Sequence, residues 1–300
     1  MCDIWKSTDA REMSAADLER HLADIDRLSV KWVVLSGGEP LMHSDLFRLC
    51  EPLRERGIRI TLLSTGLLIR RHAQSIVRCI NDVIVSLDGP PAIHDRIRRV
   101  PGAFEQLRCG VSSLLQLQPG YAVSARSTVQ RLNCGALCET ARAAKESGLS
   151  AISFLAVDVT SSAFNRADSW TQERQESVAL TKDQLPILRQ QIRELIAEWE
   201  GTGFVLESRE KLERLVRHFE AQLGLAEPVS PVCNAPWVSA VIETDGQVRP
   251  CFFHAPIGRL NGNTLLEILN GPQAVAFRAN LDIGTNPVCK RCVCSLNLRQ

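Results

Sequence analysis

The first 157 residues alternate between short apolar runs and amphipathic stretches, and this alternation restricts the possible folds more than any other feature. The runs expected to form strands cover residues 32–35, 58–63, 83–87, 121–129 and 151–157. Because continuous apolar strands joined by helices pack into parallel sheets with the helices outside, the pattern predicts an α/β fold. Five strands are too few for a complete eightfold barrel, so we expect part of one.

The intervening stretches carry helix start and stop signals. Ser14 and Asp17 have the spacing of a capping box ahead of an apolar stripe that continues to Leu28. Pro52 is expected to kink the next helix, which ends at Gly57. Further helices are expected over 67–79, 101–117 and 135–147, with two more near 182–200 and 209–222.

Polar, turn-forming residues follow three successive strands, at the edge where such a fold places its chemistry. Exposed backbone groups beside paired glycines can bind an amino-acid group, and nearby carboxylates can accept from an ammonium or a ribose hydroxyl. Each turn alone is also what an ordinary strand-to-helix connection prefers, but three in succession favour a binding site. The residues are Gly37, Gly38, Glu39 and Pro40, then Ser64 and Thr65, then Ser86 and Asp88.

The last cysteines form a second pattern. Cys233 and Cys251 stand eighteen positions apart, Cys289 and Cys292 form a C-x-x-C pair, and Cys294 lies just beyond. Thiolates are soft ligands, so zinc or an iron–sulfur cluster is favoured over magnesium or calcium. Four unlinked core cysteines are the alternative, which the full set disfavours. Nearby, His254 is expected beside the ligands or on the surface rather than as a ligand.

Composition limits the remaining possibilities. A chain of 300 residues with 45% hydrophobic content can bury a large core and hold two domains. The N-terminus lacks the apolar stretch of a secretory signal, and no run is long enough to span a bilayer. We therefore expect a cytoplasmic protein without a membrane partner. The net charge of +1 gives no support for a nucleic-acid-binding surface.

The strand-end residues resemble motifs of the radical S-adenosylmethionine (SAM) enzymes. Residues 35–40, Leu-Ser-Gly-Gly-Glu-Pro, look like the GGEP segment of that family, and Ser86-Leu-Asp-Gly89 looks like the end of its fourth strand. The resemblance implies a partial (βα)6 barrel in which the strands above are the second to the sixth. It also implies that SAM contacts the strand-end residues and Met1. Arg126 is either a partner of the SAM carboxylate or part of an ion pair at the barrel rim.

The family's first strand ends in a C-x3-C-x-φ-C loop (φ, a hydrophobic residue) whose three thiolates hold a 4Fe–4S cluster. Met1 and Cys2 resemble the end of this loop, with Met1 as the hydrophobic residue and Cys2 as the third ligand. Two ligands and the first strand are then missing, which suggests a start assigned too late or a shortened chain. One thiolate cannot hold the cluster, so the chain as written is expected to be inactive in SAM cleavage.

The C-terminal cysteines resemble the SPASM domain, and more closely its shorter twitch form, which holds an auxiliary 4Fe–4S cluster. The resemblance assigns Cys233, Cys251, Cys289 and Cys292 as ligands, with Cys294 in reserve, and Gly246 fits the spacing. A hairpin is expected between 238–242 and 247–249. The expected domains are a barrel over 1–157, a helical connector over 158–228 and a cluster domain over 229–300.

The resemblance implies a radical SAM oxidoreductase or maturase. Such an enzyme cleaves SAM reductively, and the 5′-deoxyadenosyl radical takes hydrogen from a peptide or small-molecule substrate. An electron donor such as flavodoxin or ferredoxin would be its partner. The alternative is a non-catalytic scaffold that binds zinc or an iron–sulfur cluster, which the missing cysteines would favour. No catalytic residue can be named from the sequence.

Overall fold

The structure is a computed structural model that describes residue 3, residues 11–163, residue 166 and residues 169–298. Its contacts divide the chain into two units, each built from separate segments. The barrel unit comprises Trp32–Val157 and Thr171–Glu227, and the cysteine unit comprises Met1–Lys31, Asp158–Trp170 and Pro228–Gln300. The contact units are discontinuous in sequence, whereas the three expected domains are consecutive, so those domain boundaries stay a prediction.

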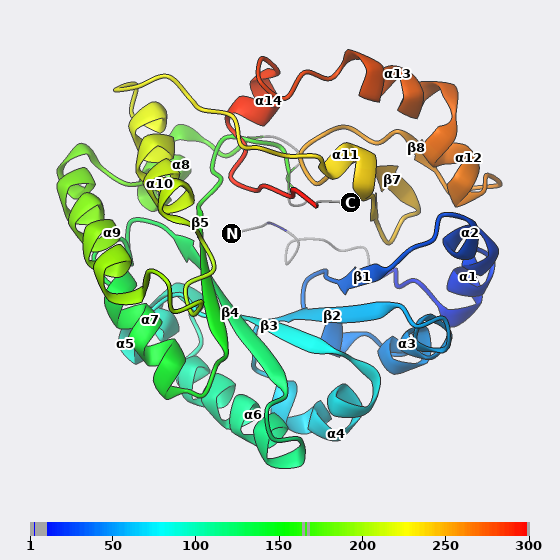
Figure 1. The fold of residues 1–300 in the computed structure, drawn as a ribbon, viewed down its shortest axis with the longest axis horizontal. Helices are drawn as coiled ribbons and strands as arrows, with labels where there is room; N and C mark the ends of the chain where they lie inside the picture. Colours follow the sequence, from blue (N-terminus) through cyan, green and yellow to red (C-terminus); the bar gives the residue numbers. More distant parts are fainter. Residues whose placement is uncertain (1–2, 4–10, 164–165, 167–168, 299–300) are drawn as a thin grey trace. The chain divides into compact units, whose positions relative to one another are not determined.

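The barrel unit contains the predicted parallel sheet (Figure 1). Its strands pair in chain order, each parallel to the next. The fold-class prediction, a partial α/β barrel with a small C-terminal sheet, is therefore confirmed. The strands are β1 Trp32–Leu35, β2 Arg59–Ser64, β3 Asp82–Ser86, β4 Ala122–Val129 and β5 Ala151–Ala156.

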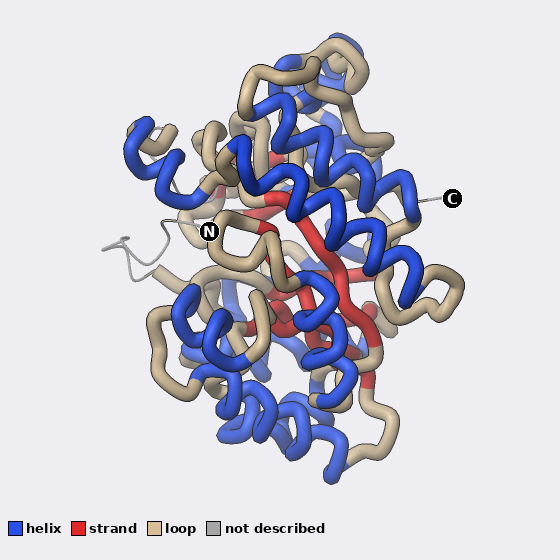
Figure 2. The backbone as a smooth tube through the Cα atoms, turned by 90° about the vertical axis from the view of Figure 1, so that its left-hand side faces the viewer, coloured by secondary structure: helices blue, strands red, loops and turns tan. Residues whose placement is uncertain are grey.

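Helices cover the outer side of this sheet, and Figure 2 shows them as blue coils around the red strands. Side chains such as Leu62 and Val85 from the sheet and Leu107 from a helix are fully buried between the two layers, which is the burial that stabilises such a sheet. The elements are η2 Pro40–Met42, α3 Leu46–Glu55, α4 Ile69–Cys79, α5 Pro91–Arg98, α6 Ala103–Leu117, α7 Leu137–Glu146, α8 Gln172–Val178, η3 Lys182–Gln184, α9 Leu185–Trp199 and α10 Arg209–Gln222.

Some helices differ from expectation. α3 continues past Pro52 to Glu55, and the expected kink at Pro52 stays a prediction. α5 was not expected; Pro91 supplies its first residue, where a missing backbone N–H costs nothing, and Arg99 ends it in the left-handed conformation. The stripe expected from residue 14 to residue 28 is divided into α1 Ala15–Glu19 and α2 Leu22–Arg27. The capping box of Ser14 and Asp17 is present.

The sheet continues beyond β5 through a short segment that the sequence did not reveal. The Ile152 amide donates to Phe204 O at 2.8 Å, and the Leu206 amide donates to Ile152 O at 2.9 Å. Val205 thereby pairs with Ile152 in the parallel sense. This segment leads directly to Glu207 and to the Ser208 cap of α10.

The cysteine unit holds a small antiparallel sheet, ordered β6-β7-β8. Val248, Ile257, Leu265, Ile268 and Ala274 form its core. The expected strand over 238–242 is wrong in its first half, because Pro236 helps to start a short helix, α11, that ends at Val238. The elements are α11 Ala235–Val238, β6 Val241–Ile242, β7 Gln247–Arg249, β8 Gly258–Arg259, α12 Leu265–Asn270, α13 Pro272–Asn280 and α14 Pro287–Lys290.

Candidate functional site

The carboxylate of Glu39 joins the turns that follow β1 and β2. It accepts from the Ser64 hydroxyl at 3.0 Å, from the Thr65 amide at 2.7 Å and from the Leu41 amide at 3.2 Å. The Thr65 hydroxyl also donates to it. Four donors on one half-buried carboxylate fix its position. Glu39 therefore holds the turn after β1 against the turn after β2 at this edge of the sheet.

The glycines before Glu39 leave their backbone open. Gly37 has φ +148°, a conformation that side chains other than glycine's adopt only with strain, although nothing lies within 4 Å of where a Cβ would stand. Gly37 and Gly38 are both exposed, whereas Pro40 is buried at the start of η2. A glycine is thus required at position 37 by the backbone conformation and not by a lack of space. The turn leaves its backbone groups accessible.

Asp88 is enclosed by the protein. Its side chain, 3% exposed, pairs with Arg98 at 2.7 Å and accepts from the Thr128 amide at 3.0 Å. The side-chain amide of Asn133 donates to the backbone oxygen of Asp88 at 2.9 Å. Both carboxylate oxygens therefore have partners that connect β3, α5 and β4. Direct contact between Asp88 and a ligand stays a prediction. For such a contact, Arg98 or the Thr128 amide would have to give up its bond to one of the carboxylate oxygens of Asp88.

His94 supports the same turn from beneath. The Asp88 amide donates to its Nδ1 at 3.2 Å, and the ring meets Phe104 edge-on with centroids 6.1 Å apart. Burial, followed by the charge of Arg98, lowers the pKa of His94 to about 4. The imidazole is therefore neutral, with Nδ1 as an acceptor, and acts in packing rather than in proton transfer.

Arg126 lies in register with Ser86 on one side and with Ser153 on the other. Its Nε donates to the Ser153 hydroxyl at 3.4 Å, and its side chain is exposed. Glu207, which the sequence did not reveal, accepts from the Phe154 amide at 3.0 Å. Burial raises the pKa of Glu207 to about 7, against the opposing effects of the Phe154 amide and Arg126. A carboxyl group that titrates near neutrality thus lies close to the predicted SAM-binding arginine.

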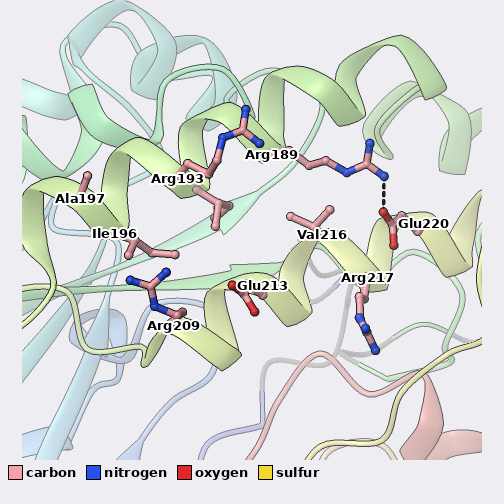
Figure 3. A pocket seen from close by; sticks show the side chains of 10 residues that line it. Arg189, Arg193, Ile196, Ala197, Arg209, Glu213, Val216, Arg217 and Glu220 are labelled. Atoms are coloured by element: carbon pink, nitrogen blue, oxygen red, sulfur yellow. Dashed lines mark hydrogen bonds and ion pairs between the residues drawn. The ribbon is translucent and has the colours of Figure 1, made fainter.

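A hollow of about 650 Å³ lies elsewhere in the barrel unit, between α9 and α10. Arg189, Arg193, Arg209 and Arg217 line it, and Figure 3 shows Arg189 paired to Glu220. Arg209 is also paired, with Glu200 at 2.6 Å. Its walls come from helices rather than strand ends, so it is distinct from the predicted SAM edge.

The cysteine unit brings the predicted thiols near one another. Burial raises the pKa of Cys289 to about 11, and the neighbouring thiols of Cys251 and Cys233 contribute. The pKa of Cys292 is also raised, first by burial and then by Cys294, Cys251 and Cys233. Because thiols influence each other only over short distances in this way, the segments around 233, 251 and 289–294 converge. Their assignment as cluster ligands stays a prediction.

Hydrogen bonds explain why these distant segments meet. The Asn234 amide donates to Leu296 O at 2.7 Å, and its side chain exchanges two hydrogen bonds with the backbone of Leu298. Asn286 caps α14 by accepting from the Cys289 amide at 3.2 Å. The Cys292 amide donates to Cys289 O at 3.1 Å, which closes the turn of the C-x-x-C pair.

Met1 and Cys2, the residues assigned to the barrel cluster loop, lie outside the described residues. The adjacent Asp3 accepts from Trp170 Nε1 at 3.1 Å. Trp170 in turn lies under Arg166, 4.3 Å from its ring centroid, and Arg166 pairs with the buried Asp158 at 2.8 Å. The segment after β5 is thereby attached to the residue that follows Cys2.

Within residues 3, 11–163, 166 and 169–298, no three His, Cys, Asp or Glu side chains are placed to hold a single metal ion. None of the helices in these ranges is both long and apolar enough to cross a membrane.

Family comparisons agree with both parts of this geometry. Residues 1–117 match the family model of the radical SAM superfamily, and residues 233–293 match that of SPASM, an iron–sulfur cluster-binding domain. The N-terminal part of the chain thus belongs to the radical SAM superfamily, and the C-terminal part is a SPASM domain. The cofactors of such a protein are the radical SAM 4Fe–4S cluster, SAM and an auxiliary iron–sulfur cluster. Whether the domain is of the shorter twitch form stays a prediction.

Curated relatives are similar in sequence to part of this chain. An AdoMet-dependent heme synthase of Methanosarcina barkeri is 28% identical over 145 residues, 47% of this chain and 41% of the relative. A pre-heme d1 synthase of Dinoroseobacter shibae is 34% identical over 141 residues, 46% of this chain and 34% of the relative. The chain thus spans less than half the length of these two relatives.

Solved structures resemble the whole fold. Native anSMEcpe with bound AdoMet is 17% identical with a TM-score of 0.66, and the match covers 97% of this chain and 82% of that one. Streptococcus suis SuiB bound to the precursor peptide SuiA is 14% identical with a TM-score of 0.63, and the match covers 99% and 68%. At these identities the likeness concerns the fold alone.

The residues of the cysteine unit fit the auxiliary cluster. Five thiols come from three segments that the structure brings together, and soft sulfur ligands suit iron–sulfur clusters. The described residues leave the barrel cluster untested, because Cys2 lies outside them.

Proposed function

We propose that this protein is a radical SAM oxidoreductase or maturase with one auxiliary 4Fe–4S cluster, held by Cys233, Cys251, Cys289 and either Cys292 or Cys294. The observation that carries the proposal is the convergence of these thiols in a chain whose strand ends match the radical SAM family. When bound, the barrel cluster supplies the electron that divides SAM into methionine and a 5′-deoxyadenosyl radical.

The chain's own residues position SAM. Gly37 and Gly38 offer open backbone groups to the amino-acid end of SAM, while Glu39 holds the next turn at the correct place. Arg126, exposed beside Ser86, can bind a carboxylate with its planar guanidinium. These residues bind and orient, and the cofactor carries the difficult chemistry.

The substrate is a peptide or a small molecule from which the radical takes hydrogen. Fold neighbours bound to peptides support the first class, and relatives named as heme synthases support the second. A small electron-transfer protein such as flavodoxin or ferredoxin would supply the electron.

The test uses the full-length protein encoded by the gene, purified anaerobically. We expect bound iron and sulfide, visible absorption of iron–sulfur clusters, and 5′-deoxyadenosine when SAM and dithionite are added. A matched Arg126→Gln variant should keep its iron and bind SAM more weakly. Zinc without iron in the wild-type protein would instead identify a non-catalytic scaffold and overturn the proposal.

A further inference from the structure

One histidine lies against a predicted ligand of the auxiliary cluster. His254 Nε2 is 3.4 Å from Cys289 Sγ, and both side chains are buried, with 9% and 7% exposed. This separation is within the range of a hydrogen bond to sulfur. The imidazole is a side-chain donor in reach of this sulfur.

The surrounding structure fixes the imidazole. Phe277 of α13 meets the His254 ring at a centroid distance of 5.0 Å and an interplanar angle of 67°. Phe277 itself packs against the apolar core of the cysteine unit. Arg249 Nη1 donates to the backbone oxygen of His254 at 3.1 Å. Ring and backbone are therefore both held.

The sulfur is fixed as well. Cys289 lies in α14, where Asn286 accepts from its amide at 3.2 Å. The thiol of Cys292 has a different contact, because it donates to Cys294 O at 3.3 Å. The cysteine unit thus places a histidine against the sulfur of Cys289 before any metal binds.

We propose that His254 is a positioning residue that donates an Nε2–H hydrogen bond to the Cys289 thiolate of the auxiliary cluster and raises the reduction potential of that cluster. The inference rests on the proposed function insofar as that function supplies the cluster. A donor to a ligating sulfur stabilises negative charge, and the reduced cluster carries one more negative charge than the oxidised cluster. Reduction is therefore favoured, which suits a cluster that accepts one electron.

The experiment compares His254→Phe with His254→Gln, which can keep an N–H donor, in the full-length protein. Iron and sulfide are counted first, and an EPR-monitored titration then gives the midpoint potential of the auxiliary cluster. We expect His254→Phe to lower the one-electron reduction constant roughly tenfold, a shift of about 59 mV to more negative potential. His254→Gln should recover part of the shift. Equal potentials in wild type and His254→Phe at full iron content would overturn the inference.

A second readout needs no variant. In protein labelled with ¹⁵N at histidine alone, hyperfine spectra of the reduced wild-type auxiliary cluster should show a weak coupling, as expected for an imidazole one hydrogen bond from the sulfur. A strong coupling would mean that His254 ligates iron directly, and no coupling would mean that it does not approach the cluster; either result overturns the inference. Neither measurement depends on SAM cleavage, so both remain decisive even if no 5′-deoxyadenosine is formed.

Discussion

The strand-end edge and the cysteine unit satisfy their polar groups in opposite ways. At the strand ends, the carboxylates of Glu39 and Asp88 accept several hydrogen bonds from protein donors. In the cysteine unit, burial and neighbouring thiols raise the pKa of Cys251, Cys289 and Cys292, which disfavours the thiolate form. The protein itself therefore supplies the partners of the carboxylates at the first site, whereas at the second site bound metal would make the thiolate forms favourable.

The largest effect should come from removing one thiol. We expect Cys289→Ser to abolish the auxiliary cluster and to lower iron by about four atoms per chain, the content of one cubane cluster. The control is Cys109→Ser on α6, which lies in the barrel unit and should keep all iron. Iron and sulfide analysis measures both variants. Full iron in Cys289→Ser would contradict the assignment of this residue.

The next effect should come from the enclosed ion pair at the strand ends. Asp88→Asn leaves the Arg98 charge without its partner, and breaking such a buried pair costs about 3 kcal/mol of unfolding free energy. Urea unfolding measures the loss, and the double variant Asp88→Asn/Arg98→Gln should regain part of it. A cost near that of a surface substitution would mean that the strand ends are not fixed by the protein alone.

A smaller effect is expected at Glu39. Glu39→Gln replaces an acceptor of four hydrogen bonds by a group with one acceptor oxygen, so the turn after β2 should loosen. SAM affinity should fall roughly tenfold, or about 1.4 kcal/mol. Equilibrium binding of SAM to the full-length, cluster-loaded protein measures this, with exposed Glu51→Gln as the control. Unchanged affinity in both Glu39→Gln and Asp88→Asn would refute the binding role assigned to these carboxylates.

The same contrast explains what the sequence could predict. The five strands were found within one or two residues because each has its own apolar run. The approach of the thiols followed from cysteine spacing. The partners of Glu39 and Asp88 could not be predicted, because Ser64, Thr65 and Arg98 meet them only when neighbouring turns align at the edge of the sheet. β8 was missed because its two residues carry no pattern.

Glu207 was missed for a related reason and supports the smallest prediction. The segment before it pairs with β5 through three residues, too few for a recognisable alternation. The carboxyl group of Glu207 is half-buried, accepts a hydrogen bond from the Phe154 amide and lies near Arg126. It belongs to the barrel unit but resembles the thiols, because burial disfavours its charged form.

The pH dependence of the unfolding free energy tests whether burial disfavours the charged form of Glu207. The pKa of Glu207 is raised from 4.5 to about 7, so between these values the folded protein keeps a proton that the unfolded chain has lost. Unfolding free energy should therefore fall as pH rises from 4.5 to 7 and then level off; one group contributes at most about 1.4 kcal/mol per pH unit, and solvent exposure reduces this. Urea titrations should show the decline in wild type and not in Glu207→Gln.

Glu210→Gln is the control, because the Ser208 hydroxyl lowers the pKa of exposed Glu210 and leaves it ionised in this window. The same pH profile in wild type and Glu207→Gln would mean that Glu207 is ionised in the folded protein and that the barrel unit holds no carboxyl group disfavoured by burial at this edge.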